Sequence, residues 1–266
     1  MHAILFDTTR CKGCERCVAA CIEANGTDPS AAAYDRATTK DGLSAQRLLA
    51  VVRVEQGRFT RLSCMHCIEP SCVAACLVGG LRKSPEGPVV YDPDKCIGCR
   101  YCMLACPFHI PRYEWDRTAP LMRKCSMCTE RLEQGQVPAC VQACPNEVML
   151  AGDRNELIAR AHEMLRLHPE KYLPRVWGEN EFGGTSILFV SDVDLSAVGW
   201  PAEAVVSIPS LTDPLVRKTP LIGLSVGLGC WGLSAIIQRR NKLMGAGGAK
   251  NADELPIADA ERGEND

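Results

Sequence analysis

The residues of this chain that could do chemistry are its cysteines, and their spacing repeats. Seventeen of the 266 residues are Cys, and sixteen of them fall into four groups of four. Thiols gathered this closely favour a soft metal, because a disulfide pairs two Cα atoms about 4.4–6.8 Å apart and needs no run of thiols at every third position. The groups are motif I (Cys11, Cys14, Cys17, Cys21), motif II (Cys64, Cys67, Cys72, Cys76), motif III (Cys96, Cys99, Cys102, Cys106) and motif IV (Cys125, Cys128, Cys140, Cys144).

The spacing predicts cubane [4Fe–4S] clusters. A cubane needs four thiolates aimed at four corners, and three cysteines at steps of three cover only one face of it. Motifs I and III follow the C-x2-C-x2-C-x3-C run of bacterial ferredoxins, in which the fourth Cys serves a partner cluster. Motif III is also followed by Pro107, whereas motif I has Ile22 at that place, and motifs II and IV lengthen the gap before the third Cys. Because every motif keeps four cysteines, we expect four [4Fe–4S] clusters.

Structural zinc is the alternative metal. Zinc prefers two well-separated C-x2-C pairs around one tetrahedral ion, so a three-Cys run leaves one thiolate over at each site. Four such runs favour iron–sulfur clusters. The seventeenth cysteine, Cys230, lies in an apolar C-terminal run, where we expect a small buried hydrophobic residue and not a ligand.

Several polar side chains close to the motifs are candidates for tuning a cluster. His66 lies within motif II and His109 follows motif III. Either could change a reduction potential through a hydrogen bond, although exposure or a bond to the backbone is the alternative. Nearby basic residues would offset cluster charge, or they form an ordinary solvated face. They are Lys12, Arg16, Arg100, Arg123 and Lys124. No nucleophile with a base is visible, so no catalytic residue is predicted.

Short elements are expected to hold the motifs in an α+β fold. Apolar runs predict strands at residues 2–7, 48–54, 89–91 and 187–190. The small apolar residues before the last Cys of each motif predict a short helix there. Asp153, followed three residues later by Glu156, is an N-terminal helix signal, and apolar residues at helical spacing predict a helix over 153–165.

The C-terminal part of the chain has a different composition. The net charge of −2 argues against nucleic-acid binding. Residues 221–237 carry no charge, and seventeen residues is the lower limit for spanning a bilayer; a buried core helix is the alternative. The expected organisation is a four-cluster domain over 1–205, a linker over 206–219, a transmembrane helix over 220–238 and a disordered tail over 239–266.

The order and spacing of the motifs resemble the four-cluster ferredoxin-type iron–sulfur (beta) subunits of membrane-bound respiratory oxidoreductases. That group includes subunits of quinone-reducing nickel–iron hydrogenases, formate dehydrogenase N, and dimethyl sulfoxide and polysulfide reductases. The stretches that carry the resemblance are 64–72 (CMHCIEPSC), 96–107 (CIGCRYCMLACP) and 183–186 (GGTS). The resemblance covers roughly residues 2–200, and a C-terminal single-span anchor is similar to the hydrogenase and formate dehydrogenase members.

The resemblance implies two pseudo-symmetric bacterial-ferredoxin-like halves with interleaved ligands. Motifs I and IV would form one half, and motifs II and III the other. Within each half, the last Cys of one motif would complete the cluster of its partner motif. The implied ligand sets are site A (Cys11, Cys14, Cys17, Cys144), site B (Cys125, Cys128, Cys140, Cys21), site C (Cys64, Cys67, Cys72, Cys106) and site D (Cys96, Cys99, Cys102, Cys76).

The resemblance also implies a function. The chain would be a non-catalytic subunit that relays electrons between a catalytic subunit and an integral-membrane, quinone-linked subunit. The catalytic partner would be of the nickel–iron hydrogenase or the molybdenum/tungsten formate dehydrogenase type. An electron-input subunit of a quinol-oxidising reductase and a soluble polyferredoxin are the alternatives.

The expected location is the cytoplasmic (inner) membrane, through a single-pass anchor. No signal peptide precedes the strand at 2–7, so we expect a partner to carry the chain across, or the cluster domain to face the cytoplasm. Two basic residues precede the apolar run and three follow it, which favours a periplasmic cluster domain. They are Arg217, Lys218, Arg239, Arg240 and Lys242.

Overall fold

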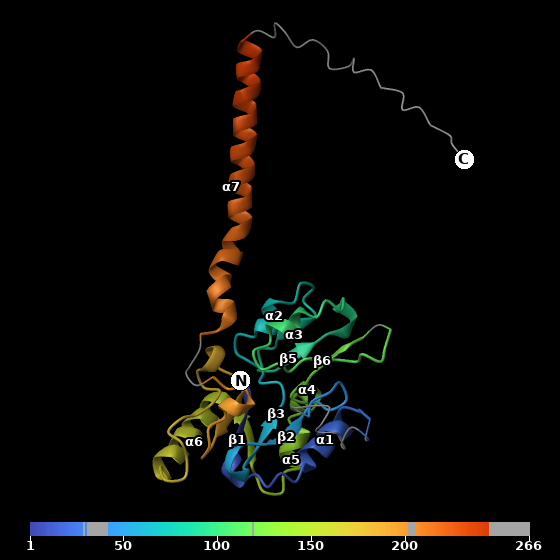
Figure 1. The fold of residues 1–266 in the computed structure, drawn as a ribbon, viewed down its shortest axis with the longest axis vertical. Helices are drawn as coiled ribbons and strands as arrows, with labels where there is room; N and C mark the ends of the chain where they lie inside the picture. Colours follow the sequence, from blue (N-terminus) through green and yellow to red (C-terminus); the bar gives the residue numbers. More distant parts are fainter. Residues whose placement is uncertain (29, 31–41, 119, 202–205, 245–266) are drawn as a thin grey trace, which may run out of the picture. The chain divides into compact units, whose positions relative to one another are not determined.

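A computed structural model describes residues 1–28, 30, 42–118, 120–201 and 206–244 (Figure 1). The chain forms two compact units, Met1–Thr212 and Asp213–Asp266. The first unit mixes short helices and strands, as the predicted α+β class requires. Its strands are β1 (His2–Asp7), β2 (Ala50–Arg53), β3 (Phe59–Leu62), β4 (Leu81–Lys83), β5 (Val89–Tyr91), β6 (Arg112–Tyr113), β7 (Met122–Arg123), β8 (Met149–Asp153) and β9 (Ile187–Val190). Its helices are α1 (Arg16–Ala24), α2 (Ser71–Ala74), α3 (Tyr101–Ala105), α4 (Thr129–Glu133), α5 (Ala139–Gln142) and α6 (Arg154–Leu167).

Most of the predicted elements are present. The strands predicted at 2–7, 89–91 and 187–190 are β1, β5 and β9, and the strand predicted at 48–54 is the shorter β2. The predicted helix over 153–165 is α6, and Asp153 caps it by accepting hydrogen bonds from the amides of Asn155 and Glu156 at 2.8 and 3.4 Å. Short helices also lie before or across the last Cys of each motif, as α1, α2, α3 and α5.

A three-stranded sheet separates the cysteine motifs from α6. Its strand order is β8-β1-β9, with β1 antiparallel to β8 and parallel to β9. Successive side chains of a strand point to opposite faces. Accordingly, Ile4 and Phe6 enter the core that also contains cysteines, whereas Ala3 and Leu5 pack with Leu157 of α6. Figure 1 shows α6 beside β1.

Three two-stranded hairpins, β2–β3, β4–β5 and β6–β7, lead into motifs II, III and IV. Motif I is entered from β1. A 3-10 turn precedes motif I at Thr8–Arg10 and motif III at Pro93–Lys95, and an Asp side chain accepts an amide hydrogen bond at the start of each turn. Helix α1 packs against α5, and α2 packs against α3. The packing therefore joins motif I to motif IV and motif II to motif III.

The C-terminal helix α7 (Ile208–Leu243) is longer than predicted at both ends. The segment 206–219, predicted as a linker, is helical from Ile208. Ser207 explains this start, because its Oγ accepts a hydrogen bond from the Ser210 amide at 3.2 Å. Asp213 and Arg217 form an i,i+4 ion pair at 2.6 Å that supports the same turns. Of the predicted tail over 239–266, residues up to Leu243 are helical, and 245–266 lie outside the described residues.

The predicted transmembrane segment 220–238 lies inside α7. Among the described residues, α7 is the one helix long and apolar enough to cross a membrane, with a mean hydropathy of 1.8 over eighteen residues. No part of that window is buried by protein. Cys230 is exposed on α7, so the prediction of a small buried hydrophobic residue was wrong.

Candidate functional site

A left-handed turn precedes the second Cys of every motif. The φ angles there are +65° at Gly13, +48° at His66, +70° at Gly98 and +59° at Met127. Non-glycine residues adopt this conformation rarely, so its recurrence marks one loop geometry used four times. Gly13 has no alternative, because a Cβ there would lie 2.7 Å from the Phe59 ring. The turn curls the two cysteines around a common centre.

A second recurring turn follows the last Cys of three motifs. Positive φ angles occur three residues after it, at Gly79, His109 and Glu147. In motifs III and IV the next residue donates its amide to the cysteine sulfur, at 3.5 Å to Cys106 and 3.4 Å to Cys144. Backbone amides thus point at the sulfurs, as expected where thiolate charge must be stabilised.

Two cavities are each lined by four cysteines that come from two different motifs. One cavity has three cysteines of motif I and the last of motif IV; the other has three of motif IV and the last of motif I. The packing of α1 on α5 produces this exchange. The first cavity contains all members of site A (Cys11, Cys14, Cys17, Cys144), and the second all members of site B (Cys125, Cys128, Cys140, Cys21).

The cysteines of motifs II and III also meet. Burial raises the pKa of Cys67, and the charges of Cys64, Cys106 and Cys72 raise it further, so all four members of site C are neighbours. Burial likewise raises the pKa of Cys102 of site D, and Cys96 and Cys99 add to the shift. The fourth predicted member, Cys76, packs against the same apolar cluster as Cys102.

The donor sets fit a multi-iron cluster. Burial raises the pKa of Cys17 and Cys125 to about 12 and that of Cys106 to about 11. These thiols would stay protonated at neutral pH unless a cationic metal core stabilised the thiolates. In the part of the chain that the structure describes, no three His, Cys, Asp or Glu side chains gather as closely as one metal ion requires. Each proposed set offers four thiols, the number of ligands that one [4Fe–4S] cluster takes.

The two histidines proposed as tuning residues differ. The side chain of His109 is exposed, and its backbone adopts the left-handed turn that follows motif III. His66 is fully buried, and its Nδ1 accepts a hydrogen bond from the Val89 amide at 2.9 Å. His66 therefore bonds to the backbone, which the sequence analysis gave as the alternative to tuning a cluster. Burial, with the nearby Lys124, Lys83 and Arg61, lowers the pKa of His66 well below its usual value, so the ring is neutral.

The basic residues named from the sequence are mostly at the surface. Lys12 and Arg16 are exposed. Arg100 stacks on Trp115, with its guanidinium carbon 4.5 Å from the ring centroid, and Arg123 pairs with Glu114 at 3.2 Å. Lys124 is the exception. It is buried, and its Nζ donates to the carbonyl of Cys125 at 3.1 Å.

The sequence did not identify two cations near the motifs, the buried Arg61 and the half-buried Lys83. Arg61 of β3 is 2% exposed and lines the cavity of site B. Lys83 of β4 donates to the carbonyl of His66 at 2.9 Å, and burial lowers its pKa to about 8. Arg61 lies three residues before motif II and Lys83 thirteen residues before motif III, and each is in a strand that was not predicted. Predicting β3 as a strand buried on both faces would have drawn attention to Arg61.

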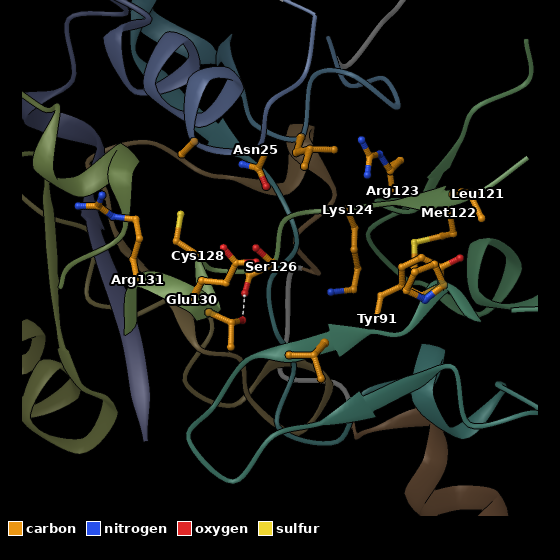
Figure 2. Close-up of a pocket in the computed structure, with 15 residues that line it drawn as sticks. Asn25, Tyr91, Leu121, Met122, Arg123, Lys124, Ser126, Cys128, Glu130 and Arg131 are labelled. Atoms are coloured by element: carbon orange, nitrogen blue, oxygen red, sulfur yellow. Dashed lines mark hydrogen bonds between the residues drawn. The ribbon is translucent and has the colours of Figure 1, made fainter. Parts of the chain in front are cut away.

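A larger cavity of about 560 Å³ lies next to site B (Figure 2). Lys124 lines it from the loop after β7, and Glu130 and Arg131 line it from α4. Thr129 donates a hydrogen bond to the Ser126 carbonyl at 2.7 Å. Its described lining includes one thiol, that of Cys128. The larger cavity is therefore not lined by any of the four predicted sets of cysteine ligands.

Loops of clustered cysteines on short helices and hairpins define a ferredoxin-type iron–sulfur domain. In agreement, the family model of a 4Fe-4S dicluster domain matches residues 55–154. The chain is also similar to three curated proteins. It is 36% identical to a protein of Nitratidesulfovibrio vulgaris over 257 residues, which covers 91% of this chain and 68% of that protein. It is 31% identical to the Escherichia coli hydrogenase-2 operon protein HybA, covering 90% of this chain and 84% of HybA. It is 33% identical to a subunit of the Escherichia coli anaerobic dimethyl sulfoxide reductase, covering 65% of this chain and 82% of that subunit.

The chain belongs to the family of ferredoxin-type iron–sulfur electron-transfer subunits of respiratory oxidoreductases. The predicted family is confirmed, and so is the predicted role in electron transfer.

Proposed function

We propose that the chain binds four [4Fe–4S] clusters, at sites A, B, C and D, and passes electrons through them between two partner subunits. The observation that carries this proposal is the pair of cavities in which two motifs exchange their last cysteines. A single motif presents three thiols to one face of a cube, so the exchange supplies the fourth corner. The clusters would supply one-electron redox chemistry, and the protein would supply ligands, spacing and charge.

The proposal includes two pseudo-symmetric halves. Motifs I and III share an Asp-capped 3-10 turn, a left-handed turn and a following helix, α1 or α3. Motifs II and IV share a proline directly before a four-residue helix, Pro70 before α2 and Pro138 before α5. Because α1 packs on α5 and α2 on α3, each half would combine one motif of either kind.

Neighbouring thiols support a linear order of sites A, B, C and D. Burial raises the pKa of Cys17 in site A most, and Arg61 lowers it. The charge of Cys140 in site B raises it further, so these two thiols are neighbours. Cys64 of site C acts in the same way on Cys125 of site B. The remaining link joins sites C and D through Cys72 and Cys102.

The two ends of this order are open to the surface. Of the sixteen proposed ligands, the exposed ones are Cys14 of site A and Cys99 of site D. Sites B and C contain only buried and half-buried cysteines. An electron relay needs this arrangement, because each terminal cluster must approach a partner while the inner clusters stay away from water.

The proposed partners are a catalytic subunit of the nickel–iron hydrogenase or molybdenum/tungsten formate dehydrogenase type and an integral-membrane, quinone-linked subunit. The likeness to HybA, a hydrogenase-2 operon protein, supports the hydrogenase type. The likeness to a dimethyl sulfoxide reductase subunit supports the alternative in which electrons run from quinol to a reductase. Helix α7 would anchor the chain in the inner membrane, with the cluster domain in the periplasm, because more basic residues follow the apolar run than precede it.

The relay is tested in native membranes by comparing the full chain with a chain that ends at Thr212, the last residue of the first unit. The full chain is expected to sediment with membranes. Its clusters should be reduced by the partner's substrate and reoxidised by added quinone. The shortened chain should keep its iron, leave the membrane fraction and lose reoxidation by quinone. If the shortened chain stayed with the membranes and kept that reoxidation, α7 would not be the anchor. Clusters that never respond to quinone in either chain would favour a soluble polyferredoxin.

A further inference from the structure

Arg61 is a buried cation, and two of its three side-chain hydrogen bonds go to sulfur. Its guanidinium donates to Cys140 Sγ at 3.9 Å, to Met149 Sδ at 3.3 Å and to Ser63 Oγ at 2.9 Å. Its Nε is buried without a hydrogen-bond partner. Sulfur is a weak acceptor, so this set leaves much of the donor capacity of the guanidinium unused.

No carboxylate of the described residues pairs with Arg61. The ion pairs found there use other arginines, including Arg58 of the same hairpin, which pairs with Asp192 at 2.5 Å. A buried charge is costly unless an opposite charge compensates it. Arginine does not escape this cost by losing its proton, because it stays charged at any ordinary pH. The anionic partner of Arg61 must therefore be something other than a carboxylate.

The surroundings of Arg61 indicate where that anion lies. Arg61 lines the cavity of site B together with all four cysteines of that site. Its guanidinium also donates to the Sγ atom of Cys140, one of those four cysteines, at 3.9 Å. The charge of Arg61 therefore lies beside the sulfurs that would bind iron as thiolates.

We propose that Arg61 is the buried counter-ion of the cluster at site B, and that its charge raises the reduction potential of this cluster. The inference rests on the proposed function, which places a cluster at site B. Reduction adds one electron and no proton, so the reduced site carries one more negative charge. A fixed positive charge in a protein interior stabilises that form more than the oxidised form. Site B is a central member of the relay, so Arg61 would set how readily electrons pass between its two ends.

The test is a redox titration of the purified full chain, followed by electron paramagnetic resonance. The signal of site B is identified as the one lost in a Cys21→Ser chain. In Arg61→Gln, the reduced-to-oxidised ratio of site B at a fixed potential is expected to fall at least tenfold. That fall corresponds to a potential about 59 mV lower for a one-electron couple. Arg61→Lys keeps the charge and should change the ratio much less. Arg58→Gln removes a charge from the surface of the same hairpin and should leave site B unchanged.

Several outcomes would overturn the proposal. One is an unchanged site B potential in Arg61→Gln, and another is an equal fall in Arg61→Lys and Arg61→Gln. If Arg61→Gln loses the cluster of site B, the iron contents of Arg61→Gln and Arg61→Lys are compared. Retention in Arg61→Lys supports a charge role, and equal loss in both variants shows that only the shape of the side chain matters. A wild-type chain without a cluster signal at site B would instead contradict the proposed function itself.

Discussion

Replacing Cys21 with Ser is expected to damage the cluster of site B and to leave that of site A in place. Cys21 belongs to motif I by sequence, but it lines the cavity of motif IV. Burial and the charges of Cys125, Cys140 and Cys128 all raise the pKa of its thiol, which identifies those three as its neighbours. Serine oxygen is a poor substitute for a soft thiolate ligand of iron. Iron should therefore fall by up to one cluster per chain, as measured by iron analysis and electron paramagnetic resonance.

Cys17→Ser is the matched control, because Cys17 lies in the same helix α1 and lines the cavity of site A. It should damage site A and spare site B. The two variants should therefore lose different signals. If Cys21→Ser and Cys17→Ser lost the same signal, each motif would hold its own cluster, and the exchange of cysteines between motifs would be wrong.

Removing the iron is expected to abolish cooperative folding of the cluster domain. Helices α2 and α5 have four residues each, and β6 and β7 have two, which is too short for stability on their own. Thiols of sites A and B belong to the largest apolar core, together with Met65 and Met127. Without clusters, nothing would cross-link the four cysteine loops around this core. The charge of Arg61 would also be buried without compensation. Structural metal can contribute roughly 10–16 kcal/mol to folding, comparable with the whole stability of a typical domain.

The measurement is thermal unfolding followed by circular dichroism after anaerobic treatment with an iron chelator. The treated chain should lose its cooperative transition and become sensitive to protease between motifs I and IV. A chelator already saturated with iron is the control and should have no effect. An iron-free chain that unfolds at the same temperature as the untreated chain would contradict this expectation.

Local patterns in the sequence were sufficient for the motifs and for the more regular elements. Strands β1 and β9 are apolar runs that are almost fully buried, and α6 carries both a cap and helical periodicity. Such features depend on near neighbours in the chain, so they can be predicted without tertiary information. Strands β6 and β7 could not be predicted, because two residues carry no period.

The features that depend on tertiary packing were beyond the sequence. Which motif completes which cavity is decided by α1 packing on α5, and spacing alone says nothing about that contact. Burial of Arg61 likewise follows from its place over site B, because arginine in a strand usually faces solvent. The start of α7 at Ile208 depends on the side chain of Ser207, one polar residue in a segment without a helical pattern.

The number of clusters is the central claim, and a combined iron and acid-labile sulfide analysis of the anaerobically purified chain tests it most directly. Four filled sites predict sixteen irons and sixteen sulfides per chain. Eight of each would restrict the relay to one half of the domain. Zinc in place of iron, with no labile sulfide, would contradict the account as a whole.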